Sequence, residues 1–420
     1  FSTAETYTLG AGTVTVIKTN QFDTVFSGPI SGDGGFTKTG DGTLQLTAVN
    51  SYNGTTTINA GVVQFANDYS FYGANSSVSI SDKLTVASGA TVALAVGGTN
   101  SFTAGRIADF AAEANNIAIL DGTLSISADS NLGSAPGSTT PGQLTLDDGT
   151  LATAATMTLH ANRGITLGSS GGTFQPSEST SLTYGGIISG DGSLIKAGNG
   201  ELILTGVNTY SGGTTVSAGT LTLGPGASTT GNITNNASLT FNRADDYTFN
   251  QSISGTGNVV QDGFILRFTQ AQSYAGDTAI KSGAYLVLPT SVDQGLAATT
   301  NVDIEAGGFL DFSNRATTIA GLTGAGEVYS FGGNAGVLTG TIANSSGLDL
   351  GSSGTLDLTA KDSFTFGSTQ FVSGSGSLNL GADKNLTIAG SLSPGSSPGI
   401  INVSGNLILD STTITNLELA

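Results

Sequence analysis

A serine and a histidine are the first residues that could do nucleophilic chemistry. Ser170 lies in the stretch Gly168–Gly172, which satisfies the spacing G-x-S-x-G, the pattern of a nucleophilic serine on a strand-to-helix turn. A Ser-His-Asp arrangement would need His160, because the chain has one histidine. His160 follows an alternating strand pattern, where an outward imidazole is ordinary, and no helical pattern follows Ser170. We therefore expect no catalytic residue in this stretch.

Paired carboxylates are the second candidate, since glycoside hydrolysis uses two of them. The visible pairs are Asp147-Asp148 and Asp245-Asp246. Adjacent residues on a strand point to opposite faces, so neither pair converges by itself. The chain also has no tryptophan to stack on a sugar ring. We expect no enzyme activity, with a polysaccharide-acting β-helix enzyme as the alternative.

Composition excludes several other classes of site. The 420 residues include no cysteine and 12 Lys+Arg against 30 Asp+Glu, a net charge of −18. A structural zinc site, a disulfide and thiol chemistry are excluded, and so is a surface that tracks nucleic-acid phosphates. Neither an EF-hand loop nor a G-G-x-G-x-D run occurs, so we expect no metal and no cofactor, while the net charge leaves weak surface cation sites open. No apolar run is long enough to span a membrane as a helix, and we expect no membrane insertion by this segment.

Internal repeats organise the chain. Residues 30–61 and 188–219 align without a gap at an offset of 158, and residues 253–283 form a weaker copy that is one residue shorter. Including their flanks, the copies cover 26–65, 184–223 and 249–288, with degenerate copies near 319–350 and 373–409. Direct copying favours a stacked array over a sandwich. We therefore expect one continuous β-helix over residues 1–420.

The local period predicts how each copy folds. Apolar-x-apolar pairs such as Leu202/Leu204 place two side chains on one face of a short strand, and Gly, Asn, Asp or Ser separates the strands. The expected fold is all-β, a right-handed parallel β-helix with about 20 residues per rung and rungs about 4.8 Å apart. A helical stripe predicts one short lateral helix near 103–114. Residues 133–143 contain two prolines and are expected to form a loop.

Polar residues recur at fixed repeat positions. Lys38 and Lys196 share one position, where the third copy has Gln261. Because the charge is dispensable, we interpret this position as a solvated residue in a turn rather than a binding site.

An Asn-x-Tyr pattern also recurs, as Asn50/Tyr52 and Asn208/Tyr210, with Gln272/Tyr274 in the third copy. An asparagine can close a turn onto its own backbone. A tyrosine ring can cover the bend while its hydroxyl stays in water. Both roles are structural.

The repeated string G-x-G-x-x-x-K-x-G-x-G-x-L-x-L-x-x-x-N-x-Y-x-G-x-T-x-x-x-x-G resembles the autotransporter-associated β-strand repeat of bacterial type V secretion passengers. The first copy matches it at Gly32, Gly34, Lys38, Gly40, Gly42, Leu44, Leu46, Asn50, Tyr52, Gly54, Thr56 and Gly61. The second copy matches it at Gly190, Gly192, Lys196, Gly198, Gly200, Leu202, Leu204, Asn208, Tyr210, Gly212, Thr214 and Gly219. Residues 390–399 resemble a segment often found near the end of such passengers.

The resemblance implies export and an extracellular, cell-surface location. Passengers of this kind include adhesins, fibres, proteases and lipases, so it implies the architecture more than an activity. We expect a structural or interaction protein that mediates adhesion or self-association, binding surface glycans or proteins. The alternative is an inert stalk for another domain.

The ends of the sequence lack the signal peptide and the membrane barrel that the family usually has, so we expect a processed passenger or a fragment. Rung-like apolar residues occur at both ends, including Val14, Leu417 and Leu419. An uncapped solenoid leaves strand edges and apolar core open. Head-to-tail stacking of chains is therefore one expectation, and truncation is the other.

Overall fold

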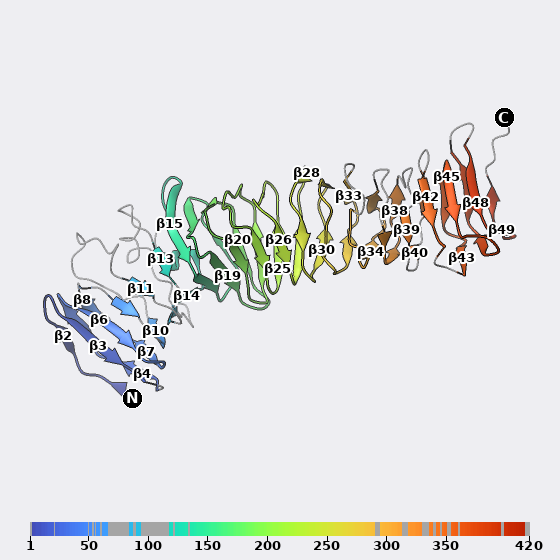
Figure 1. The fold of residues 1–420 in the computed structure, drawn as a ribbon. Coiled ribbons are helices and arrows are strands. Elements are labelled where there is room, and N and C mark those ends of the chain that lie inside the picture. Colours follow the sequence, from blue (N-terminus) through green and yellow to red (C-terminus); the bar gives the residue numbers. More distant parts are fainter. Residues whose placement is uncertain are drawn as a thin grey trace. The chain divides into compact units, whose positions relative to one another are not determined.

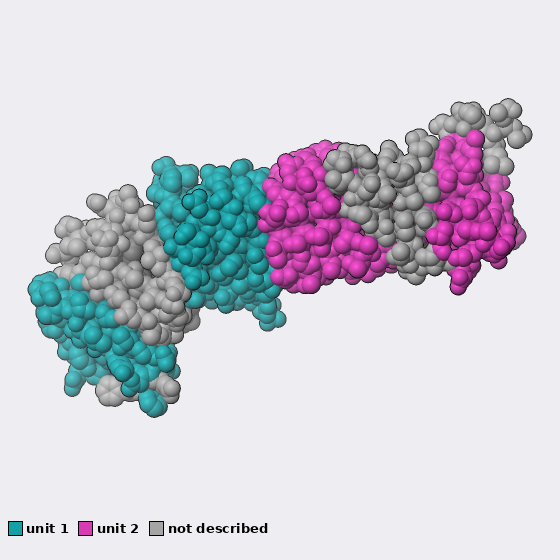
Figure 2. Space-filling view, in the orientation of Figure 1, with its two compact units in different colours: residues 1–221, 226–231 teal, residues 222–225, 232–420 magenta. Residues whose placement is uncertain are grey.

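Alternating apolar residues form short strands throughout the residues that the computed structural model describes. These residues are 2–20, 22–48, 50–52, 54, 56–58, 61–65, 84–86, 90–93, 117–120, 122–132, 135–289, 295–312, 318–329, 336–338, 342–344, 347–350, 354–359, 362–395 and 399–415. They fall into two units, coloured separately in Figure 2. Unit 1 comprises residues 1–221 and 226–231, and unit 2 comprises residues 222–225 and 232–420.

In unit 1, three strands and their turns make up most rungs of a parallel β-solenoid (Figure 1). Its described elements are β1 (Ser2–Thr3), β2 (Tyr7–Leu9), β3 (Val14–Lys18), β4 (Thr24–Phe26), β5 (Ile30–Gly32), β6 (Gly35–Thr39), β7 (Thr43–Leu46), β8 (Ser51–Tyr52), β9 (Thr56–Ile58), β10 (Gly61–Phe65), β11 (Leu84–Val86), β12 (Ala90–Ala93), β13 (Ile117–Leu120), β14 (Gly122–Ile126), the 3-10 helix η1 (Asp129–Leu132), β15 (Thr140–Asp147), β16 (Gly149–Thr153), β17 (Met157–Leu159), β18 (Arg163–Leu167), β19 (Gly172–Pro176), β20 (Ser181–Tyr184), β21 (Ile188–Gly190), β22 (Leu194–Lys196), β23 (Glu201–Leu204) and β24 (Thr214–Val216). Strand β25 (Thr220–Leu223) begins in this unit and ends in the other.

Strands of successive rungs pair in parallel within unit 1. One sheet runs β4-β7-β10-β12-β14-β16-β19-β22-β24. A second face carries β3-β6-β9-β11 and, because β11 contacts β13, also β13-β15-β18-β21. A third face carries β2-β5-β8 and β17-β20-β23, whose strands each follow a strand of the first sheet along the chain. The pairing keeps equivalent residues in register, as in Leu124↔Leu151 and Leu151↔Phe174. Since the side chains of these three residues are buried, the inward positions form an apolar column through these three rungs.

Unit 2 is built in the same way. Its described strands are β26 (Ile233–Asn235), β27 (Ser238–Phe241), β28 (Asp246–Phe249), β29 (Ile253–Ser254), β30 (Asn258–Gln261), β31 (Ile265–Phe268), β32 (Thr278–Ile280), β33 (Tyr285–Val287), β34 (Asn301–Ile304), β35 (Phe309–Asp311), β36 (Thr318–Ile319), β37 (Gly321–Gly324), β38 (Glu327–Tyr329), β39 (Gly336–Leu338), β40 (Ile342–Asn344), β41 (Gly347–Asp349), β42 (Gly354–Asp357), β43 (Ser363–Phe366), β44 (Phe371–Gly374), β45 (Gly376–Asn379), β46 (Asn385–Ile388), β47 (Ser391–Pro394), β48 (Ile401–Ser404), β49 (Asn406–Leu409) and β50 (Ile414–Thr415). The longest ladder within it is β28-β31-β33-β35-β38-β41-β44-β47-β50, again parallel throughout.

These observations confirm the expected all-β parallel solenoid. That the two units form one continuous β-helix over residues 1–420 stays a prediction. The helix expected near 103–114 lies outside the described residues, as do Leu417 and Leu419.

The loop expected over 133–143 is wrong for its last four residues. Strand β15 already begins at Thr140 and contains Pro141. The register of its pairing with β18 shifts between Thr140 and Leu144. A proline lacks an N–H for the ladder, and such an irregularity is one of the few places where a strand tolerates it.

Candidate functional site

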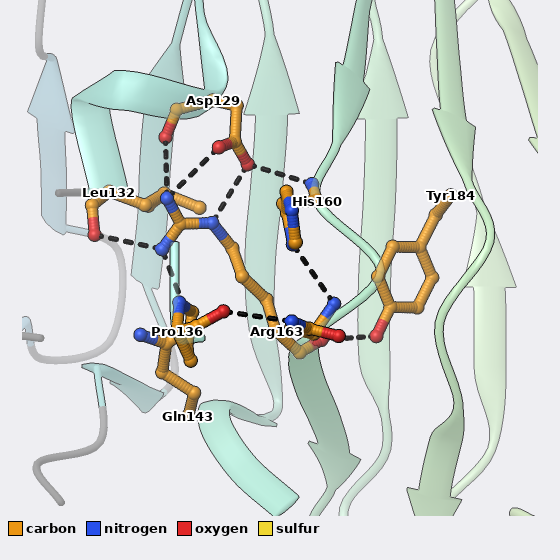
Figure 3. A network of polar contacts seen from close by, with 8 residues as sticks. Asp129, Leu132, Pro136, Gln143, His160, Arg163 and Tyr184 are labelled. Atoms are coloured by element: carbon orange, nitrogen blue, oxygen red, sulfur yellow. Dashed lines mark hydrogen bonds and ion pairs between the residues drawn. The ribbon is translucent and has the colours of Figure 1, made fainter. Parts of the chain in front are cut away.

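The candidate serine and histidine lie at opposite ends of β18. Ser170 is exposed in the turn before β19, where its backbone N–H donates to Asp147 Oδ1 at 2.8 Å. His160 is exposed in the turn before β18, and its Nδ1 accepts from the Asn162 backbone N–H at 3.2 Å (Figure 3). Because the five residues of β18 span about 16 Å, the two side chains do not meet, and no helix follows Ser170.

The carboxylate pairs do not form an acid and base either. Asp147 bonds the backbone of Ser170, while Asp148 is exposed with a left-handed φ of 60°. Asp245 accepts two bonds from the Arg243 guanidinium, at 2.9 and 2.7 Å. That guanidinium holds the pKa of the Asp245 carboxyl below its usual value, so it cannot donate a proton near neutral pH.

Asp246 faces a different cation. It accepts from Nε and Nη2 of Arg267, both at 2.9 Å. The two adjacent carboxylates therefore serve two separate ion pairs, as expected from their opposite directions along the chain.

The repeat lysines are not solvated, and the interpretation as exposed turn residues is wrong. Lys38 and Lys196 are both fully buried. Lys196 stands in the inward column between Phe174 and Val216, its partners on the neighbouring strands. It bends from the core to the end of its strand. There its Nζ donates to the carbonyls of Ala197, Gly198 and Ala218 at 2.8, 2.9 and 2.9 Å.

The first copy repeats this arrangement. Lys38 Nζ donates to the carbonyls of Thr39 and Gly40, at 3.3 and 2.6 Å. Burial lowers the pKa of both lysines, that of Lys196 to about 8. The ammonium donates to half-buried turn carbonyls at the end of its strand, so its role is structural.

The tyrosine of the Asn-x-Tyr pattern is also more deeply buried than expected. Tyr210 is fully buried, and its hydroxyl bonds Thr214 Oγ1 at 2.6 Å instead of meeting water. In the third copy Tyr274 bonds Thr278 Oγ1 at the same distance. The hydroxyl thus fixes the path of the chain from the bend into the next strand.

The asparagine closes its own turn, as expected, and also links neighbouring rungs. Asn208 Nδ2 donates to the Gly206 carbonyl at 3.1 Å. Its Oδ1 accepts from the Ile188 N–H of the preceding rung at 3.0 Å, and Nδ2 reaches the Ser228 carbonyl at 3.0 Å. One side chain therefore supplies bonds that a regular ladder would make at this corner.

Sequence reasoning missed a buried arginine in unit 1 (Figure 3). Arg163, at 1% exposure, makes a bidentate ion pair with Asp129, with Nε–Oδ1 at 2.8 Å and Nη2–Oδ2 at 3.0 Å. Its Nη1 donates to the Leu132 carbonyl at 3.1 Å, and Gln143 Oε1 lies 3.4 Å away. Because Asp129 and Leu132 bound η1, the guanidinium anchors that helix against β18.

Neighbours of Arg163 extend this anchor. Asn162 Nδ2 donates to the Pro136 carbonyl at 2.8 Å, and the Tyr184 hydroxyl donates to the Arg163 carbonyl. The Asp129 carboxylate also accepts the His160 backbone N–H at 3.0 Å. The contacts drawn in Figure 3 join these side chains to the backbone or to one another, as in a structural anchor.

The outward face of the β14-β16-β19 sheet is uncharged. Thr123, Thr150 and Thr173 are in register on it, followed by Ile195 and Thr215 on β22 and β24. Among the described residues, no group of three His, Asp or Glu side chains could hold a metal ion. No helix in the described part of the chain is long and apolar enough to cross a bilayer.

Comparison with known proteins places these features in a family. A family model described as the passenger-associated-transport-repeat matches residues 36–65 and 194–223. These two segments contain Lys38 and Tyr52 of the first copy, and Lys196 and Tyr210 of the second. The repeats predicted from the sequence are therefore repeats of autotransporter passengers.

A relative supports the same assignment. Over 266 residues the chain is 31% identical to the adhesin BmaC autotransporter of Brucella suis biovar 1, strain 1330. The match covers 53% of this chain and 8% of that protein, so the chain spans a small part of the length of its relative. No solved structure matches the chain. The matched repeats and the relative are those of autotransporter passengers, and a passenger of this kind is surface-exposed and extracellular.

Proposed function

We propose that this passenger segment takes part in adhesion, presenting the outward faces of its solenoid to molecules on other surfaces. The observation that carries the proposal is the similarity over 266 residues to a protein named as an adhesin. The site geometry supports a role in binding rather than catalysis. The buried Lys196 and Asn208 bond backbone groups. Ser170 and His160 lie at opposite ends of β18, and Asp245 and Asp246 serve separate ion pairs.

An attachment assay tests the proposal. Beads coated with the purified chain are incubated with cultured epithelial cells, with immobilised extracellular proteins and with glycans. We expect the coated beads to bind at least one of these surfaces above beads coated with albumin, and the soluble chain to compete. No binding to any surface, by chain that is folded by circular dichroism, contradicts adhesion and supports the stalk.

The enzyme alternative has its own measurement. The chain is incubated with a panel of polysaccharides, and the release of reducing ends is followed. We expect none. Release that is lost in Asp245→Asn or Asp246→Asn, and retained in Asp148→Asn, would establish glycoside hydrolysis.

Homotypic contact is a second proposal. All four residues of β49 are exposed, including Leu407 and Leu409 at 41% and 47%. An exposed strand with apolar side chains is prone to pair with another chain. We expect light scattering to show association that increases with concentration and is abolished by Leu409→Lys. A monomer at all concentrations would contradict it.

A further inference from the structure

One outward face of unit 2 is apolar and aromatic, unlike the threonine-rich face of β14-β16-β19. Ile265, Tyr285 and Phe309 are in register on β31, β33 and β35. Each is half-buried and alternates with the inward-facing Leu266, Leu286 or Leu310. The three side chains therefore form one column on the outer surface.

Further apolar side chains lie beside this column. The rings of Tyr285 and Phe309 stack with centroids 4.2 Å apart and planes 20° apart. Phe264, 51% exposed, precedes β31, and its carbonyl accepts the Tyr285 N–H at 2.8 Å. Val287 is the second outward residue of β33. We call these five residues, Phe264, Ile265, Tyr285, Val287 and Phe309, the aromatic strip.

Two ion pairs lie beside the aromatic strip. In the turns before β33 and β35, Lys281 Nζ lies 2.6 Å from Glu305 Oε1. The carboxylates of Glu305, Asp262 and Asp303 together raise the pKa of Lys281. Arg267, in register with Val287, pairs at 2.9 Å with Asp246, which is in register with Ile265.

Charge over these strands is strongly one-sided. The described residues between the start of β28 and the end of β35 (246–289 and 295–311) contain six acidic and two basic residues, a net charge of −4. The aromatic strip is thus an apolar surface within an acidic field, which attracts cations and repels anions over a Debye length.

We propose that the aromatic strip is a docking site for a basic, apolar segment of a partner protein. Aromatic residues at the centre with charged residues at the rim are the usual composition of protein-binding hot spots. The surrounding carboxylates complement lysine and arginine on the partner. The inference rests on the proposed adhesive function for the existence of a partner, and it specifies where and what kind.

The ring geometry favours a protein over a glycan. A sugar stacks on an open aromatic face, but stacking takes up one face of each ring in the Tyr285–Phe309 pair. The strip also contains the aliphatic side chains of Ile265 and Val287, which suit apolar side chains of a polypeptide. The strip is small, so we expect weak binding per copy that many copies on one surface would strengthen.

A peptide titration with the full chain tests the inference. The probe is a short fluorescent amphipathic peptide of leucine and lysine, and its counterpart has glutamate in place of lysine. We expect the lysine peptide to bind by fluorescence anisotropy and the glutamate peptide not to bind. Raising the salt from about 50 to about 300 mM should weaken binding several-fold.

Variants locate the binding. We expect Tyr285→Ser and Phe309→Ser each to weaken the lysine peptide about ten-fold or more. The matched control is Ile195→Ser, which removes a half-buried outward apolar residue of β22. It should bind as the unchanged chain does. Circular dichroism melting confirms that each variant is folded. If a serine variant of the strip does not fold, Tyr285→Lys, which keeps a long side chain, is measured in its place.

Three results would overturn the inference. These are equal binding of the glutamate peptide, unchanged affinity in both strip variants, and equal loss in Ile195→Ser. Glycan binding that Tyr285→Ser abolishes would show that the partner class is wrong. The bead assay separates the two proposals. If beads coated with Tyr285→Ser adhere as well as beads coated with the unchanged chain, the docking site is refuted and adhesion is not. If the unchanged chain adheres to nothing, adhesion itself is refuted.

Discussion

The second and third repeat copies place different side chains at one interior position. Lys196 lies between Phe174 and Val216 in its inward column, and Gln261 lies between Phe241 and Ile280. Lys196 donates to three carbonyls. Gln261 Nε2 reaches two, those of Phe264 at 3.5 Å and Tyr285 at 3.2 Å, and its buried Oε1 has no partner among the described residues.

The corner of the same two copies is far more uniform. Tyr210–Thr214 and Tyr274–Thr278 make the same bond at 2.6 Å. Gln272 also repeats the cross-rung bond of the shorter Asn208, accepting from the Ile253 N–H at 2.7 Å. The interior position needs a donor for turn carbonyls rather than a charge, whereas the corner needs one fixed geometry.

The largest expected effect is at the corner. Tyr210→Ala should lower the free energy of unfolding by about 3 kcal/mol, because it removes a fully buried ring, and Tyr274→Ala should cost a similar amount. Urea denaturation followed by circular dichroism measures both. If Tyr210→Ala melts as the unchanged chain does but loses binding to a partner, the residue belongs to a site rather than to the fold.

The interior position should separate the copies. Lys196→Met leaves three carbonyls without their donor and should cost about 2 kcal/mol. Gln261→Met removes two weaker bonds together with an unpaired oxygen, so it should cost about 1 kcal/mol or less. The same urea titration compares them. Equal costs would show that the three bonds of Lys196 add nothing.

The corner amide should behave alike in both copies. Asn208→Ala and Gln272→Ala each strip an acceptor from a backbone N–H, that of Ile188 or Ile253. Each should cost about 1 kcal/mol. Hydrogen exchange at these two amides provides a local readout, and unchanged protection in both variants would mean that water or a neighbouring group replaces the side chain.

The smallest expected effect is a pH dependence of stability that is largest in the second copy. Burial lowers the pKa of Lys196 to about 8 from an ordinary value of 10.5. Between these values the unfolded chain binds more protons, so stability should rise with pH. The three carbonyl acceptors oppose this by favouring the ammonium. We expect about 1 kcal/mol or less.

Lys196→Gln is the control for this pH dependence, since it removes the titrating group and copies the third repeat. The window ends near pH 10, because burial also raises the pKa of Tyr274. Above that pH unfolded tyrosines ionise and stability falls. A rise between pH 8 and pH 10 that persists in Lys196→Gln would assign it to another group.

Hydrophobic periodicity predicted the strands and direct copying predicted the solenoid, because both depend on which positions face inward. The buried cations were missed because lysine and arginine are usually solvated. The alternation of inward and outward residues along each strand could have located them. Lys196 is two residues from Leu194, and Arg163 is two residues from Ile165, so each shares the inward face of its strand. Its partners come from other rungs, which spacing along the chain does not show.

The number of residues per rung varies within unit 1. In unit 1 the paired residues Leu124 and Leu151 are 27 positions apart, whereas Lys196 and Val216 are 20 positions apart. Extra residues are absorbed where η1 lies, without loss of strand pairing. Since the turn after β14 accommodates extra residues, the solenoid is a natural display scaffold. A foreign epitope of about seven residues grafted into the exposed turn at Ser169 and Ser170 should be presented to antibodies while the neighbouring strands stay paired.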